Sequence, residues 1–273
     1  MQTPTSFHIT LVNRLNLGRA IGVEAKFMQY KSLINSQSLF HFTSSLSILK
    51  EIISSQKFLA KYCTEYCWNG YKFALPMACF CDIPMSQTIC HMNNYGFYGI
   101  GMKSSWQNSK LLSSAIYVKS KSPIVDKIGK ILNKINAKKE SNAKKNAKDA
   151  EINWYHLYLL AHIKKYCGKQ IYPNTENSRL TYFYQEREWR YVPKDFDINM
   201  LKVEHNDNKP IDVKPQTDFY LDFKPDDIRC FIIKEESERM ELINSIDKLG
   251  YSKDELNLLK SKIITSKQIL YDF

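Results

Sequence analysis

Long apolar runs are missing from this sequence. No stretch approaches the roughly 18 uninterrupted apolar residues that a membrane-spanning helix needs. Residues 1–20 lack the apolar segment and small-residue cleavage site of a secretory signal. The seven cysteines are odd in number, which suits free thiols in a reducing compartment. We therefore expect a cytoplasmic protein without a disulfide and without a membrane partner.

The motifs of several enzyme classes are also missing. The sequence has no Walker A loop, no G-x-S-x-G, no H-E-x-x-H and no Rossmann G-x-G-x-x-G. Cys63 and Cys67 have a spacing that zinc sites use, but Cys79 and Cys81 have one spacer residue, which suits a buried strand better. We expect no metal site.

Positive charge is in excess, with a formal net charge of +11. Ten lysines lie between Lys119 and Lys148, accompanied there by Asp126 and Glu140. A run of this kind can bind the phosphates of nucleic acid, which makes Lys119–Lys148 a candidate nucleic-acid segment. The interpretation we favour is a solvated loop or a helix exposed on most sides.

Strand and helix patterns are mixed along the chain. Strands are predicted at 38–43, 73–83, 95–102, 180–192 and 229–234. Helices are predicted after Ser44 or Ser45, from Pro84 to His91, at 151–166, at 235–249 and from Ser252 to about Ile269. Without regular βαβ alternation this order indicates the α+β class. We expect an N-terminal extension at 1–37 and one domain at 38–273, with a lysine-rich helical insertion at about 119–150.

A histidine, tyrosines and two glutamates form the first candidate site. His41 lies near the end of the first predicted strand, Tyr95 and Tyr98 lie midway, and Glu186 and Glu188 lie late. Such a set can bind a nucleotide ribose: the histidine donates to one hydroxyl, an aromatic ring stacks on the base, and a carboxylate stabilises an oxocarbenium-like carbon. The alternative is a hydrogen-bonded core histidine with Glu188 in an ion pair.

The run Glu186-Arg187-Glu188-Trp189-Arg190 leaves two interpretations open. Period two places both glutamates on one strand face, where their repulsion would raise the pKa of one of them. Equally, Arg187 and Arg190 can neutralise an exposed sheet edge.

A family resemblance rests on several motifs together. They are His41-Phe42-Thr43 before a capped helix, Cys79-Phe80-Cys81-Asp82-Ile83-Pro84, Tyr95-Gly96-x-Tyr98-Gly99-Ile100-Gly101 and Glu-x-Glu-Trp-Arg at 186–190. Over roughly 38–105 and 180–245 the chain resembles the AbiGi family of bacterial abortive phage-resistance proteins, described as antitoxins.

More distantly, the order of elements is similar to the ADP-ribosyltransferase fold, which implies a mixed sheet core with flanking helices. The resemblance implies that His41, with Thr43 beside it, holds a ribose of NAD and that Tyr95 or Tyr98 packs on nicotinamide. It also implies that Glu188 is the catalytic carboxylate and that Glu186 helps to activate the acceptor.

Two functions follow from the resemblance. The first is an anti-phage or toxin–antitoxin protein that uses NAD as a substrate and modifies a macromolecule, with nucleic acid as a suitable acceptor. The second is a non-catalytic antitoxin or binding module that restrains a toxin partner or binds nucleic acid. They differ in whether His41, a tyrosine and Glu188 converge on one pocket.

The lysine-rich segment gives a test of its own. We expect changing Lys138, Lys139, Lys144 and Lys145 together to Gln to leave folding and nucleic-acid affinity nearly unchanged, because an exposed lysine run contributes little to stability. Binding is measured over a salt series. A log–log slope flattened by about two to four units would instead assign phosphate contacts to this segment.

Overall fold

The computed structural model describes residues 36–66, 71–140, 155–170, 179–194, 202–205, 209–213 and 218–272. The chain divides into two units, Met1–Ser32 and Leu33–Phe273. The first unit, and so nearly all of the expected extension at 1–37, lies outside the described residues. All that follows concerns the second unit.

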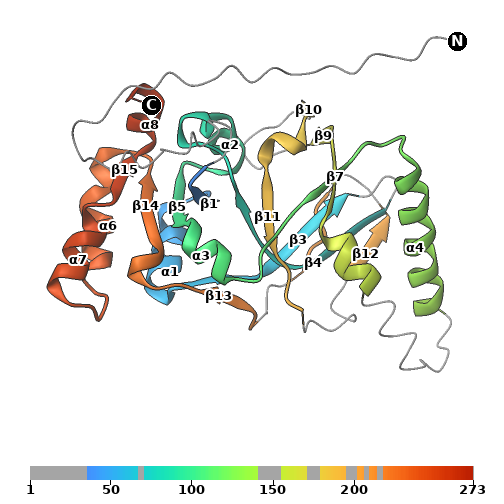
Figure 1. Cartoon of the computed structure of the whole chain (residues 1–273), viewed down its shortest axis with the longest axis horizontal. Coiled ribbons are helices and arrows are strands. Elements are labelled where there is room, and N and C mark those ends of the chain that lie inside the picture. The colour runs from blue at the N-terminus through green and yellow to red at the C-terminus, as the bar shows by residue number, and fades with distance from the viewer. Residues whose placement is uncertain are drawn as a thin grey trace, which may run out of the picture. The chain divides into compact units, whose positions relative to one another are not determined.

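Among the described residues, nine strands form one mixed sheet (Figure 1). Its order is β15-β14-β5-β1-β4-β11-β6, and β3 and β12 also pair with β4. The β14–β15 pair is parallel and the other pairs are antiparallel. The strands are β1 (Ser38–Thr43), β3 (Lys61–Tyr66), β4 (Tyr71–Cys81), β5 (Tyr98–Lys103), β6 (Ser113–Ser114), β11 (Glu188–Tyr191), β12 (Lys202–His205), β14 (Ile228–Ile233) and β15 (Ile263–Thr265).

In the part of the chain that the structure describes, three two-stranded pairs and the helices accompany this sheet. The pairs are β2 (Lys57–Leu59) with β13 (Tyr220–Asp222), β7 (Ile116–Val118) with β8 (Ile163–Lys165), and β9 (Gly168–Gln170) with β10 (Arg179–Thr181). The α-helices are α1 (Leu46–Ser55), α2 (Ile89–Tyr95), α3 (Ser104–Ser109), α4 (Pro123–Glu140), α6 (Arg239–Ile246), α7 (Lys253–Lys260) and α8 (Ser266–Asp272), and residues 155–161 are also helical. The short 3-10 helices are η1 (Met85–Gln87), η2 (Phe183–Glu186), η4 (Pro225–Asp227) and η5 (Glu236–Glu238).

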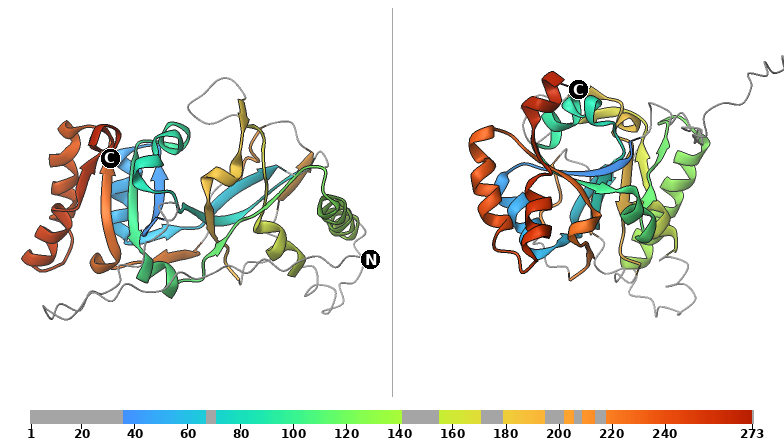
Figure 2. Two further views of the ribbon diagram at one scale, coloured as in Figure 1. Left: turned by 45° about the horizontal axis from the view of Figure 1, so that its top comes forward. Right: turned by 60° about the vertical axis from the view of Figure 1, so that its left-hand side comes forward.

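Helices lie at both ends of the sheet, and α1, α2 and α3 lie beside its central strands β1 and β5 (Figure 1). Helices α6 and α7 lie beside β14 and β15, whereas α4 lies at the opposite end (Figures 1 and 2). The main core joins α1 and α6 to the central strands through buried Leu49, Ile53, Phe80, Phe231 and Leu242. No described helix is both long and apolar enough to cross a membrane. This mixed architecture agrees with the α+β class.

The start of helix α1 matches the sequence pattern closely. Ser45 is the N-cap of α1, and its hydroxyl accepts a hydrogen bond from the backbone N–H of Ile48 at 3.3 Å. The expected apolar stripe of α1 is buried at Leu46, Leu49 and Ile53. The helix predicted from Ser252 likewise begins there as α7, where Ser252 forms a capping box with Glu255. These helix starts could be predicted from the sequence because each depends on residues only a few positions apart.

The predicted strand at 180–192 is wrong. Arg187 has a left-handed backbone, with φ of 45°, and it separates η2 from β11. The backbone N–H of Asp82 donates to the Arg187 carbonyl at 3.0 Å, and the two side chains pair at 3.2 Å. These contacts with a distant segment hold the turn.

Four other predicted elements are shorter than expected or divided. The helix at 151–166 gives way to strand β8 at Ile163, and the final helix ends at Lys260, where a β-branched run forms β15. The predicted strand at 95–102 starts only at Tyr98, because Tyr95 closes helix α2. Helix 235–249 is divided between η5 and α6.

Part of the lysine-rich insertion is helical, as expected. Helix α4 buries Val125 and Ile128, while Lys127 and Lys130 are exposed. Residues 141–154 lie outside the described residues, including Lys144 and Lys145.

The strands β1 and β4 diverge from a single contact. Their pairing is described only at Phe40 opposite Cys81, whereas β1 pairs with β5 along all six residues. On its other side β4 pairs with β11 from Glu188 to Tyr191. The divergence leaves space between β1 and β11, and the candidate site lies there.

Gly96 fixes the approach of α2 to β1. Its φ is 120°, and an added Cβ would overlap the Thr43 carbonyl oxygen. We expect Gly96→Ala to lower the free energy of unfolding by about 2 kcal/mol or more, because this backbone region strongly favours glycine and the neighbouring atom is backbone. Gly250→Ala is the control, because nothing lies within 4 Å of an added Cβ there. Equal urea midpoints for the two variants would contradict the argument.

Candidate functional site

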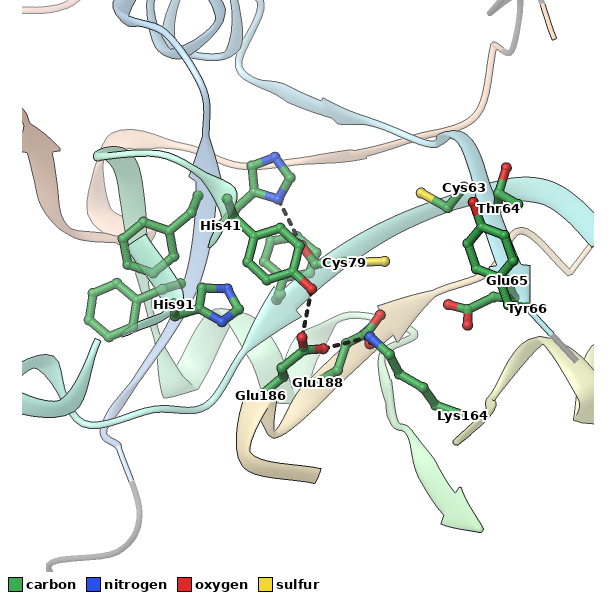
Figure 3. Close-up of a pocket in the computed structure, with 14 residues that line it drawn as sticks. His41, Cys63, Thr64, Glu65, Tyr66, Cys79, His91, Lys164, Glu186 and Glu188 are labelled. Atoms are coloured by element: carbon green, nitrogen blue, oxygen red, sulfur yellow. Dashed lines mark hydrogen bonds and ion pairs between the residues drawn. The ribbon is translucent and has the colours of Figure 1, made fainter. Parts of the chain in front are cut away.

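A pocket of about 280 Å³ lies between β1, β3, β4, α2, β8 and β11 (Figure 3). Aromatic rings form much of its wall, and carboxylates and one lysine converge on one side of it. The lining residues are Phe40, His41, Phe42, Cys63, Thr64, Glu65, Tyr66, Cys79, Phe80, His91, Tyr95, Lys164, Glu186 and Glu188. Four of the six predicted site residues are among them.

Glu186 and Glu188 reach the pocket from different elements. Glu186 ends η2 and Glu188 begins β11, with the left-handed Arg187 between them. The two carboxylates therefore come together because of a turn, and the shared strand face predicted from period two does not exist. Both side chains are buried, at 6% and 7% exposure.

Lys164 bridges the two glutamates. Its Nζ atom lies 2.6 Å from Oε2 of Glu186 and 2.7 Å from Oε2 of Glu188. Burial would lower the pKa of Lys164, but the two carboxylates raise it well above its ordinary value. Sequence reasoning missed this residue, because it placed Lys164 at the end of a helix and its partners lie more than twenty positions away.

Arg190 holds Glu188 from the other side. Its side chain is completely buried, and its Nε atom donates to Oε1 of Glu188 at 2.9 Å. The same guanidinium pairs with Glu65 on β3 and donates to the Ala161 carbonyl. The alternative in which Glu188 pairs with Arg190 is therefore correct, although the pair is buried and does not neutralise an exposed edge.

These contacts decide the charge of Glu188. Burial would raise the pKa of Glu188, but Arg190 and Lys164 together hold it far below its ordinary value. The predicted raised pKa therefore does not apply to Glu188, which is ionised at neutral pH. Burial raises the pKa of Glu65, with Arg190 opposing the shift.

His41 lies on the wall of the pocket with a fixed tautomer. Its Nδ1 atom is 2.7 Å from the Cys79 carbonyl oxygen, and burial lowers its pKa. A neutral imidazole carries one N–H, and a carbonyl only accepts, so Nδ1 holds the proton and Nε2 is an acceptor. The expected donation from His41 to a ribose hydroxyl is corrected accordingly: Nε2 would accept from that hydroxyl.

Tyr95 connects the aromatic and charged sides of the pocket. Its hydroxyl donates to Oε1 of Glu186 at 2.7 Å, and its ring lies 4.4 Å from the ring of His91. Burial lowers the pKa of His91 to about 4, so this ring is neutral at physiological pH. From the sequence, His91 was predicted only to end a helix that begins at Pro84, and it was given no role in the site.

The structure places Tyr98 and Thr43 outside the pocket. They lie opposite each other on β5 and β1. The Tyr98 hydroxyl donates to Glu238 at 2.6 Å, and the Thr43 hydroxyl donates to the Ser45 carbonyl at 3.2 Å. Neither side chain lines the pocket with the other four predicted residues, because the pocket opens where β1 diverges from β4, whereas Thr43 and Tyr98 lie at the last residue pair between β1 and β5.

Cysteines contribute thiols to the pocket. Cys63 and Cys79 both line it, and hydrogen bonding to Cys63 together with burial raises the pKa of Cys79 well above its ordinary value. Cys79 therefore carries a neutral thiol. Cys67 lies outside the described residues.

The role of Arg190 can be measured by stability. We expect Arg190→Met to lower the free energy of unfolding by about 3–5 kcal/mol, because Glu188 and Glu65 would lose a buried partner. The control is Arg239→Met on α6, whose partly exposed pair with Glu236 should contribute at most about 1 kcal/mol. Urea unfolding measures the free energy of unfolding of both variants. Similar losses would show that Arg190 stabilises the fold no more than a partly exposed ion pair does.

Comparison with known proteins identifies the family to which the chain belongs. Residues 56–234 match the family described as "Putative abortive phage resistance protein AbiGi, antitoxin". The chain is 25% identical over 220 residues to "Abortive phage resistance protein AbiGi" of Lactococcus lactis subsp. cremoris, covering 72% of this chain and 86% of the relative. No solved structure matches. The match spans His91, Tyr95, Lys164, Glu186, Glu188 and Arg190, and this chain belongs to the AbiGi family of abortive phage-resistance proteins.

Proposed function

We propose that this protein acts in anti-phage defence as an ADP-ribosyltransferase-like enzyme that uses NAD to modify a macromolecule. The observation that carries the proposal is the convergence of His41, Tyr95, Glu186 and Glu188 on one aromatic pocket. These residues lie far apart in the sequence, and their order is that of the resemblance described above. Membership of the AbiGi family supports the defence role.

The pocket suits the nicotinamide riboside part of NAD. Its volume of about 280 Å³ is near the lower end of ligand pockets, so it takes part of the dinucleotide. The ring of Tyr95 can pack on nicotinamide, and Nε2 of His41 can accept from a ribose hydroxyl. Two cations, Lys164 and Arg190, face three carboxylates, which leaves one net negative charge when all three are ionised. That sign suits the positively charged pyridinium.

Glu188 would stabilise the reacting carbon. A carboxylate offers about four acceptor positions, and Lys164 and Arg190 use three of them on Glu188. The fourth, on Oε1, can accept from a ribose hydroxyl. Because Arg190 and Lys164 orient the carboxylate in advance, little reorganisation is needed as positive charge develops.

The proposed reaction is a substitution at C1′ of the ribose. The bond from C1′ to the nicotinamide nitrogen breaks, and nicotinamide leaves with the bonding electron pair. A nucleophile of the acceptor then forms the new bond to C1′, and its proton passes to Glu186 and on to solvent. The products are nicotinamide, the ADP-ribosylated acceptor and one proton.

The test is nicotinamide release from NAD with an acceptor extract. We expect Glu188→Gln to lower kcat by about 100-fold or more, the loss typical of removing one preorganised electrostatic contact. Glu238→Gln is the control, because it makes the same carboxylate-to-amide change at a glutamate that accepts the Tyr98 hydroxyl outside the pocket. Folding of each variant is checked by urea unfolding. Full turnover by a folded Glu188→Gln protein would refute the catalytic role.

A second candidate function is a non-catalytic antitoxin that restrains a toxin partner. The family description includes the word antitoxin, and the pairing of Glu188 with Arg190 and Lys164 also stabilises the fold. In this case the wild-type protein would neither bind NAD nor release nicotinamide. Calorimetric titration with NAD separates the two functions, since the enzyme must bind its substrate.

A further inference from the structure

Three tyrosines form an exposed cluster beside the site, which we call the tyrosine platform: Tyr166, Tyr182 and Tyr184. The rings of Tyr166 and Tyr184 are stacked, with centroids 4.6 Å apart and an interplanar angle of 9°. Tyr182 stands at 82° to Tyr184 and 86° to Tyr166, at 6.4 and 6.3 Å. Tyr182 and Tyr184 are 46% and 40% exposed. Large rings this exposed and this close together form a surface suited to recognition.

The platform is built on the same segments as the charged side of the pocket. Tyr184 belongs to η2, two residues before Glu186, and Tyr166 follows Lys164 by two residues. The backbone N–H of Tyr184 donates to the Tyr166 carbonyl at 3.4 Å. Between the exposed tyrosines, buried Phe183 packs under the ammonium of Lys164, at 5.4 Å. Along this segment the side chains of Phe183 and Glu186 are therefore buried, while the rings of Tyr182 and Tyr184 are exposed.

The segments around the platform are basic. Residues 163–170 and 179–185 contain Lys164, Lys165, Lys169 and Arg179 and no acidic residue. Lys169 is exposed and lies opposite Leu180 in the β9–β10 pair, two positions from Tyr182. Lys164 is paired with Glu186 and Glu188, so the exposed cation beside the rings is Lys169. Exposed aromatic rings and a nearby cation are the two components of single-strand nucleic-acid binding: the rings stack on bases and the cation contacts a phosphate.

We propose that the tyrosine platform binds an unpaired base of single-stranded nucleic acid. In duplex nucleic acid the base faces are stacked on their neighbours, so the platform selects single strands. Where the bound strand is taken as the acceptor of ADP-ribose, the inference rests on the proposed function. Binding itself requires only the rings and the lysines.

The experiment measures binding of a fluorescein-labelled single strand of about 12 nucleotides by fluorescence anisotropy, using the full chain. DNA and RNA strands are tested with a duplex of the same sequence. Tyr182→Ala with Tyr184→Ala removes the exposed rings, and Tyr182→Phe with Tyr184→Phe keeps them. Tyr271→Ala is the matched control, because Tyr271 is 77% exposed on α8. If the double Ala variant does not fold, Tyr182→Leu with Tyr184→Leu replaces it and keeps apolar bulk without an aromatic face.

We expect the ring-removing variant to bind about tenfold or more weakly, and the Phe variant and Tyr271→Ala to bind within about twofold of wild type. The log–log salt slope should stay unchanged in the ring-removing variant, because the lysine contacts with phosphate remain. Wild-type affinity in the ring-removing variant, or equal affinity for duplex, would overturn the proposal. The proposal would also be overturned if the ring-removing variant bound the strand normally but lost a protein partner, because the platform would then be a protein interface.

The outcome can be separated from that of the proposed enzyme. Glu188→Gln keeps the platform, so it should bind the labelled strand as wild type does. Platform-dependent binding without nicotinamide release would leave the binding inference standing and reject the enzyme. Nicotinamide release together with strand binding that does not depend on the platform would support the enzyme and reject the binding inference.

Discussion

The interaction on which the rest of the site depends is the buried pairing of Glu188 with Arg190 and Lys164. Removing an ion from water costs several kcal/mol, and only close partners of opposite sign offset this cost. The partners here come from β11 and β8, and Arg190 reaches on to Glu65 of β3 and to the Ala161 carbonyl. The network therefore joins strands that share no ladder and fixes the relative position of β8, β3 and β11.

A second constraint is the divergence of β1 from β4. If these strands stayed paired beyond Phe40 and Cys81, side chains of the sheet would fill the space that the pocket occupies. Helix α2 closes the side of this space by the tight approach of Gly96 to Thr43, and it carries Tyr95 and His91 with it. The ion-pair network thus positions the charged side of the pocket, and the approach of α2 to β1 positions the aromatic side. The Tyr95–Glu186 hydrogen bond connects the two sides.

The features that could be predicted from the sequence depend on residues close together in the chain. The cap at Ser45, the capping box at Ser252 and the apolar strand leading to Cys81 depend on residues a few positions apart, and all were predicted. The break at Arg187 depends on Asp82, more than a hundred residues away, and the role of Lys164 depends on two carboxylates of another segment. Periodicity carries no information on such partners. The set His41, Tyr95, Glu186 and Glu188 was grouped from the sequence, and its members share one pocket. The position of Tyr98 and Thr43 outside that pocket was not foreseen, because it depends on where β1 diverges from β4.

The chemistry of the network bears on its purpose. If it served stability alone, apolar residues of similar volume would serve equally well, since replacing a buried ion pair in that way is often neutral or stabilising. Here Glu186, Glu188 and Glu65 all reach a pocket wall, and the neutral imidazoles of His41 and His91 line the same space together with the ring of Tyr95. The cations of this cluster lie behind or between the carboxylates and hold them toward the pocket. Carboxylates held toward a pocket with aromatic walls agree with the proposed binding of a cationic, aromatic ligand.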